Sequence, residues 1–139
     1  DTAALQLRDE WNLLVVKASY MTFSRPEVDL PEPEWRHGLH GGAVETAMMR
    51  HLRSDLVRDG EVARFTSSAE ALDDTLARLA PEGEASWAWR AEDLHPSGAV
   101  GDASLATAAL GARLVAHYGQ VLADVLADTA RFPLDRLQS

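Results

Sequence analysis

The pattern of apolar residues predicts one helix in the middle of the chain and a longer helix near its end. Residues 43–53 carry apolar side chains at helical spacing, while two arginines lie off that stripe. A longer stripe of the same kind runs through residues 103–128 and consists of Leu110, Leu114, Tyr118, Val121 or Leu122, and Val125. Asp102 stands where an N-cap residue belongs. We therefore expect helices over 43–53 and 103–128.

Two shorter helices are predicted from residues that begin or end a helix. Residues 2–10 combine apolar and charged positions as the end of a helix does. A second helix is expected from Ser67 or Ser68 to about residue 80, with Ser68 as its cap, because its leucines are spaced by four and three positions. Pro81 and Gly83 would end it.

Two segments are predicted to be strands and two to be loops. Residues 13–16 form a continuous apolar run, which is typical of a strand buried on both faces. Residues 85–91 place Trp87 and Trp89 on one side of an extended segment, which also indicates a strand. Residues 24–42 hold three prolines and three glycines, so we expect a long loop there. A second loop is expected over residues 95–101.

Strands separated by helices predict an α/β fold. We expect a three-layer α/β/α arrangement with a mainly parallel sheet, and we treat residues 1–139 as one structural unit. Two strands cannot form a stable parallel sheet alone. The sheet is therefore expected to continue in another polypeptide or in a part of the protein outside this chain.

Composition and charge exclude several classes of function. The chain has 13 Lys and Arg residues against 22 Asp and Glu residues, a formal net charge of −9, which argues against binding to nucleic acid or to anionic lipid. The absence of cysteine excludes disulfide scaffolds, zinc–thiolate sites and cysteine nucleophiles. No apolar segment is long enough to span a membrane, and we expect a cytoplasmic protein. The first residues lack an initiator methionine and a signal core, so we expect a processed chain, a separate piece or a trimmed chain.

The densest group of chemically useful residues lies in residues 34–46. It contains His37 and His40, which suit proton transfer or metal binding, and three glycines that let a ligand approach the backbone. Glu45 falls in the first turn of the predicted helix, where a negative charge is favoured. The alternative is that both histidines are exposed loop residues and Glu45 is an ordinary helix-start carboxylate. His-x-x-His without a third ligand is a weak metal signal.

Other notable residues have a simpler interpretation beside the functional one. His51 is expected to be a surface or packing residue, the two tryptophans of residues 85–91 to be core residues rather than a stacking platform, and Asp102 to be a helix cap rather than a catalytic acid. Gly111 and Gly119 are unusual inside a helix. Close packing of another backbone against that helix face would explain them.

Two blocks of the sequence resemble one known family. Residues 40–57, which begin HGGAVETAMM, resemble the H-A-G-x-x-E-T-S-x-M-L…L-R-P-D-L-V segment of the creatininase (creatinine amidohydrolase) family. Residues 97–108, SGAVGDASLATA, together with Gly111 resemble its S-G-V-x-G-D-P-x-x-A-T-A-E-x-G segment, and the two blocks occur in the family's order. Small residues replace the family's Ala, Ser and Pro at three positions, which are Gly41, Ala47 and Ala103.

The resemblance covers the C-terminal half of the family's domain and nearly the whole of this chain. Members of the family carry two metal ions, often zinc and manganese, held mostly by an upstream E-x-H-G-P-H-L-P segment with a later Asp, and by an N-G-H-x-x-N segment. Neither segment occurs in this sequence. The resemblance therefore implies that the N-terminal half, as a missing or separate polypeptide, supplies most metal ligands. It also implies a ring-like homo-oligomer of such pairs, a hexamer.

The resemblance also implies roles for single residues. His40 would act on the substrate amide as a proton donor, and Glu45 would lie beside the metals and could itself bind metal. Trp35 would help to close the site, and Gly41 and Gly42 would contact substrate. His37 matches no motif position of the family; its place in the Pro- and Gly-rich loop instead predicts a rim residue that touches substrate. The implied reaction is metal-dependent hydrolysis of a non-peptide C–N bond in a small cyclic amide or formamide. The alternative is a non-catalytic or degenerate subunit that serves assembly with a complete partner.

Overall fold

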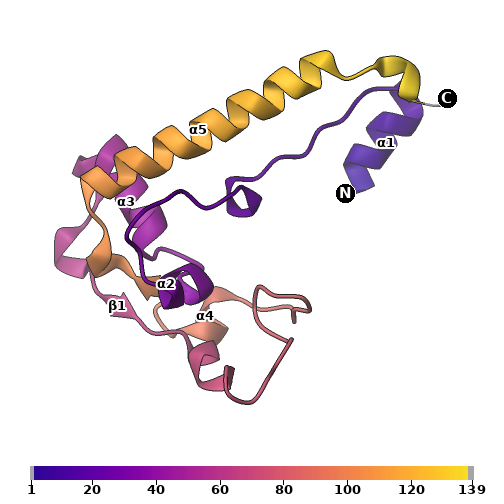
Figure 1. The fold of residues 1–139 in the computed structure, drawn as a ribbon. Helices are drawn as coiled ribbons and strands as arrows, with labels where there is room; N and C mark the ends of the chain where they lie inside the picture. The colour runs from indigo at the N-terminus through magenta and orange to yellow at the C-terminus, as the bar shows by residue number, and fades with distance from the viewer. Residues whose placement is uncertain (1, 138–139) are drawn as a thin grey trace. The chain divides into compact units, whose positions relative to one another are not determined.

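The computed structural model describes residues 2–137, which fall into two compact units. One unit comprises Asp1–Arg25 and Ala116–Ser139, and the other comprises Pro26–Val115. The longest helix of the described residues is α5 (Ala108–Arg131; Figure 1). It contributes residues to both units. The expectation that the whole chain behaves as one structural domain stays a prediction.

The first unit is built from helices and a long extended segment. Helix α1 (Thr2–Trp11) confirms the predicted N-terminal helix. Asn12 follows it with a φ of 50°, in the left-handed region that asparagine tolerates better than most residues. A 3-10 turn, η1 (Tyr20–Thr22), follows, and η6 (Leu134–Arg136) lies near the C-terminus. The ring of Tyr118 on α5 packs against Tyr20, with 5.5 Å between ring centroids.

Residues 13–16 do not form the strand that the sequence predicts. They are extended, but they pair with no strand in the described part of the chain, and Leu13 and Val16 are 49% and 46% exposed. A strand depends on backbone hydrogen bonds to a neighbour, so an apolar β-branched run without a neighbour remains an extended segment.

The second unit contains the remaining elements, most of them short. In chain order these are α2 (Glu32–His37), α3 (Ala43–Leu52), η2 (Ser54–Leu56), η3 (Asp59–Glu61), β1 (Arg64–Phe65), η4 (Ser68–Leu72), α4 (Ala91–Leu94), β2 (Gly101–Asp102) and η5 (Ala103–Leu105), before α5 begins. Helix α3 confirms the predicted helix over 43–53. Helix α2 lies within the predicted loop over 24–42, since Pro31 precedes it and Pro33 occupies its first turn, where proline is tolerated.

The sheet of the described residues is antiparallel and has two strands. Strand β1 pairs with β2 through Arg64 opposite Asp102 and Phe65 opposite Gly101. The expected mainly parallel sheet in a three-layer α/β/α arrangement is not formed by this part of the chain, whose structure is mostly helical. Its completion by an N-terminal half stays a prediction. That expectation depended on residues 13–16 and on the tryptophan segment (residues 85–91). Neither segment forms a strand that pairs with another.

The tryptophan segment packs against the core without forming a strand. Trp87 and Trp89 are partly buried against a cluster of Ala69, Leu94 and Val100, so the expectation that they pack inward is confirmed. The expected strand over 85–91 is wrong, because residues 86–90 make no ladder and α4 begins at residue 91. The two indole rings are buried by contacts with other side chains, and such burial does not require the backbone to pair with a strand.

Two predicted helices begin or end differently in the structure. The helix expected from Ser67 or Ser68 to residue 80 is only the 3-10 turn η4, which Ser67 caps by accepting the Ala69 N–H. The leucines beyond it stay partly exposed, so no buried face stabilises further turns. Helix α5 begins at Ala108 rather than near 103, and the Thr107 hydroxyl accepts the Leu110 N–H at 3.0 Å. Asp102 is a cap, but it caps η5.

Helices α3 and α5 approach closely at Gly111. A Cβ atom at Gly111 would lie 1.9 Å from the backbone oxygen of Ala47, which confirms the expectation that another backbone packs there. Around Gly119 nothing lies within 4 Å, so that glycine has no such reason in the described structure. His51 is exposed, as expected. No helix among residues 2–137 is both long and apolar enough to cross a membrane.

Candidate functional site

The structure brings the two blocks of the sequence, residues 40–57 and residues 97–108, side by side. The N–H of His40 donates to the oxygen of Val100 at 3.1 Å, and the N–H of Val100 donates to the oxygen of His40 at 2.6 Å. Val100 is completely buried, so this bridge is anchored in the core. The backbone of His40 is therefore fixed, while its side chain is 63% exposed.

Glu45 points back from the first turn of α3 toward the loop that carries His40. Its Oε2 accepts the N–H of Gly41 and lies 3.9 Å from Nδ1 of His40. That distance is too long for a hydrogen bond, but it makes the two groups electrostatic neighbours. Because Glu45 is only 39% exposed and its direction is set by the helix, the pair presents an ordered carboxylate beside a solvent-facing imidazole.

Gly41 and Gly42 shape the turn between His40 and α3. Gly41 has a φ of +68°, which glycine adopts without the strain of a side chain, and Gly42 is the N-cap residue of α3. The Thr46 hydroxyl donates to the oxygen of Gly41 at 3.2 Å and closes this turn. Both glycines thus have a backbone role. Their predicted contact with substrate stays a prediction.

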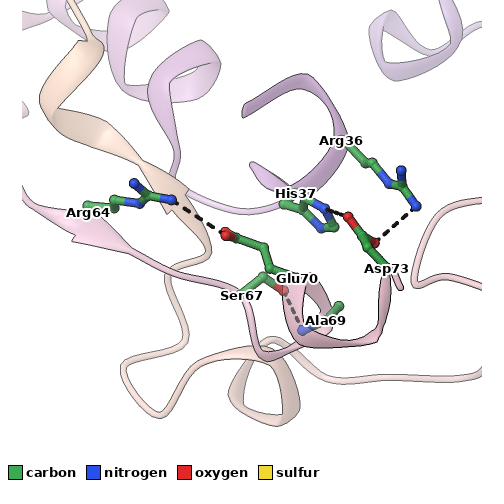
Figure 2. A network of polar contacts seen from close by, with 7 residues as sticks. All are labelled: Arg36, His37, Arg64, Ser67, Ala69, Glu70 and Asp73. Carbon is green, nitrogen blue, oxygen red and sulfur yellow. Dashed lines mark hydrogen bonds and ion pairs between the residues drawn. The ribbon is translucent and has the colours of Figure 1, made fainter. Parts of the chain in front are cut away.

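The sequence places His37 at the rim of the site, whereas the structure buries its side chain. Only 5% of the residue is exposed, and its Nε2 lies 2.8 Å from Oδ2 of Asp73. The other carboxylate oxygen of Asp73 lies 3.0 Å from a nitrogen of Arg36, so Asp73 contacts both His37 and Arg36 (Figure 2). The sequence could not show this, because Asp73 stands in a distant segment with no motif around it.

Two cavities adjoin His37. One of about 340 Å³ is lined by Glu32, Pro33, Arg36, His37, Glu70 and Asp73. The other, of about 180 Å³, borders His37, Arg64 and Glu70 and reaches Gly101 and Asp102. Figure 2 shows the side chains of Arg64 and Glu70 turned toward each other, with 3.5 Å between their charged atoms. Trp35, predicted to close the site, lies on α2 and is half-buried; its role toward substrate stays a prediction.

Glu34 is an important residue that sequence reasoning did not single out. Its carboxylate is buried and accepts two backbone N–H groups, from Ala43 at 2.6 Å and from Asp102 at 2.7 Å. These two amides belong to the two blocks that resemble the family. The signal in the sequence was weak, because a glutamate in a proline-rich segment usually lies at the surface.

The described residues do not by themselves fit a two-metal centre. Within residues 2–137 there is no cluster of three or more His, Asp or Glu side chains that could hold a metal ion. His40 and Glu45 offer two neighbouring donors at most. Metal chemistry at this site would need ligands from elsewhere.

The comparisons with known proteins give one family. The family model described as "Creatininase: Creatinine amidohydrolase" matches residues 1–126 of the 139. Neither the curated proteins nor the solved structures gave a match. The matched span includes both sequence blocks, the His40–Val100 bridge between them and the carboxylate of Glu45. On this match, the chain belongs to the creatininase family.

Proposed function

We propose that this chain supplies His40 and Glu45 to the active site of a metal-dependent hydrolase that cleaves a non-peptide C–N bond. The substrate class is a small cyclic amide or a formamide. Membership of a family described as creatinine amidohydrolases supports this proposal. The proposal also assigns substrate contacts to Trp35 and to the turn formed by Gly41 and Gly42.

The observation that carries the proposal is the pairing of an exposed imidazole with an ordered carboxylate. Glu45 is held by the N–H of Gly41, and His40 lies 3.9 Å from it on a backbone anchored to Val100. Imidazole changes protonation near neutral pH, so His40 is suited to protonate the departing nitrogen of an amide. An amine is a poor leaving group until it is protonated, which makes a positioned proton donor valuable for this reaction.

The proposal needs a second polypeptide segment. Because the described residues hold too few metal ligands, we propose that the N-terminal half of the domain, as a separate or missing polypeptide, contributes the others. The implied cofactor is zinc or manganese, two ions per site, and the implied assembly is a homo-oligomer of such pairs, a hexamer. Glu45 is the residue of this chain that we propose as a metal ligand.

The test is a comparison of three single variants in the assembled protein. We expect His40→Ala to lower kcat by about 10²–10⁴ while bound metal stays nearly unchanged, because a general acid contributes a factor of that size. Glu45→Gln is expected to lower both turnover and metal occupancy, because it removes one negative charge beside the proposed cations. The control is His51→Ala, an exposed change on α3 that should alter neither.

Rates and metal content, measured on the same preparations, decide between the assignments. Loss of all metal in His40→Ala would mean that His40 is a ligand and not a proton donor. Unchanged metal content and turnover in Glu45→Gln would remove Glu45 from the site altogether.

A second function is a non-catalytic subunit that serves assembly. What favours it is the small donor set of the described residues, since a chain that offers two donors at most depends on others for chemistry. Intact mass and metal content of the purified protein separate the two. A second polypeptide with about two metal ions per pair supports the enzyme, whereas a single species of 15.1 kDa without metal supports the subunit.

A further inference from the structure

Glu34 is a buried acidic residue that the proposed chemistry does not use. It is 6% exposed, and each of its carboxylate oxygens accepts one backbone N–H, from Ala43 and from Asp102. An ionised carboxylate is costly to bury unless it is paired or hydrogen-bonded. Two amide donors from two different segments therefore hold this charge in place, and charge-assisted hydrogen bonds of this kind are stronger than neutral ones.

Three glycine backbones enclose the carboxylate. A Cβ atom built at Gly38, Gly42 or Gly101 would lie 2.3, 2.4 or 2.8 Å from Oε1 of Glu34, and contacts under 3.0 Å are essentially never formed by real Cβ atoms. Gly38 and Gly42 stand two residues before and two residues after His40. The backbone of the loop that carries His40 therefore packs directly against the Glu34 carboxylate.

The two amides that Glu34 binds are the ones that determine where His40 and Glu45 lie. Ala43 is the first residue of α3, so its position sets the direction of Glu45 one half-turn later. Asp102 lies two residues after Val100, which is bridged to His40 by two backbone hydrogen bonds. A displacement at either amide therefore moves one member of the pair relative to the other.

We propose that Glu34 is a positioning residue, which fastens residues 38–43 to residues 100–102 and so sets the separation of His40 and Glu45. Its effect on turnover rests on the proposed function, whereas its effect on the backbone does not. Substitution by glutamine keeps the shape but offers one acceptor and one donor group in place of two acceptors. One of the two backbone N–H groups would then face another N–H and lose its partner.

The first test is hydrogen–deuterium exchange of the full chain in its natural assembly, read by mass spectrometry. In Glu34→Gln we expect exchange to become about 10-fold faster or more in residues 38–46 and in residues 99–103 together, the size expected when a hydrogen bond to a charged group is lost. Glu34→Asp keeps the charge but is too short to reach both amides, so we expect an intermediate rate. The control is Glu32→Gln, an exposed change on the same helix, which should leave both segments unchanged.

The second test is a double-mutant cycle on turnover. Misplacement of a catalytic group by about 1 Å can cost on the order of 10²-fold in rate, so we expect Glu34→Gln to lower kcat by about that factor with little change in KM. In the His40→Ala background the same substitution should have a clearly smaller further effect, because one of the two residues it positions is gone. A general loss of stability would lower the rate in both backgrounds equally.

The results that overturn the inference differ from those that overturn the proposed function. Equal exchange in Glu34→Gln and the unmodified protein, or a Glu34→Gln effect that is undiminished in the His40→Ala background, would remove Glu34 from this role. If the unmodified assembly hydrolyses no C–N bond, the proposed function fails, and the exchange measurement alone decides the role of Glu34. If Glu34→Gln does not fold, Glu34→Asp carries both tests.

Discussion

Replacing Gly111 with alanine is expected to destabilise the protein, because α3 and α5 touch at this residue. A Cβ atom there would lie 1.9 Å from the carbonyl oxygen of Ala47 and 2.9 Å from the Cβ of His51. The oxygen belongs to the backbone of α3, so no rotation of a side chain can relieve the clash. The two helices would have to separate, and the tight packing between them would be lost.

The size of the effect follows from two opposing terms. Overpacking of a tight core costs roughly 1–3 kcal/mol, and a rigid backbone neighbour favours the upper part of that range. Alanine is preferred to glycine inside a helix by about 1 kcal/mol, which offsets part of the loss. We therefore expect Gly111→Ala to lower the free energy of unfolding by about 1–2 kcal/mol. Gly119 lies on the same helix, and a Cβ atom built there would meet no side chain or neighbouring segment of residues 2–137 within 4 Å. Gly119→Ala should therefore raise the free energy of unfolding by up to about 1 kcal/mol.

The measurement is urea unfolding of the three proteins in the same assembly, followed by circular dichroism. With a denaturant slope of about 2 kcal/mol/M, Gly111→Ala should lower the midpoint by roughly 0.5–1 M and Gly119→Ala should raise it, at an unchanged slope. If both variants gained stability alike, α3 and α5 would not pack at Gly111, and the close approach of these helices would be refuted.

Two further predictions concern one buried and one partly buried side chain. His37→Ala should lower the free energy of unfolding by roughly 1–3 kcal/mol, because His37 is buried against Asp73 and away from solvent. Its effect on turnover should be much smaller than that of His40→Ala. A thermal melt and the rate on the same sample test this, and an inactive but fully stable variant would contradict it. Burial raises the pKa of the Tyr118 phenol, so the unfolded chain loses this proton first and the protein should lose stability as pH rises above about 10. Phenolate absorbance of the Tyr20→Phe protein isolates Tyr118, and titration at or below the ordinary tyrosine pKa would contradict the prediction.

The helices could be read from the sequence where an apolar stripe is also buried. Helix α3 appears where residues 43–53 indicate it, because its buried face includes Ala47, which packs against Gly111 of α5. The leucines after residue 68 have the same periodicity but stay partly exposed, and only η4 forms. Periodicity states which face a helix would bury, and packing decides whether the helix exists.

The candidate site was predictable only in part. His40 and Glu45 could be identified because both lie in one short block, and the structure does bring them to within 3.9 Å. The contact of His37 with Asp73 and the contacts of Glu34 with two amides could not be identified, because the partners are distant in the sequence. The burial of His37 was missed for this reason, and its predicted contact with substrate stays a prediction.

By itself, the sequence determined what depends on neighbours along the chain. The helix over 43–53, the Glu45 carboxylate in its first turn and the family resemblance of two blocks all follow from residues a few positions apart. Within residues 2–137, tertiary structure alone decided that the sheet is a short antiparallel pair, that residues 13–16 have no strand partner and that Glu34 is buried against three glycines. The physical reason is that hydrogen bonds of strands and of buried charges need partners from distant segments, and no local pattern encodes which segment will supply them.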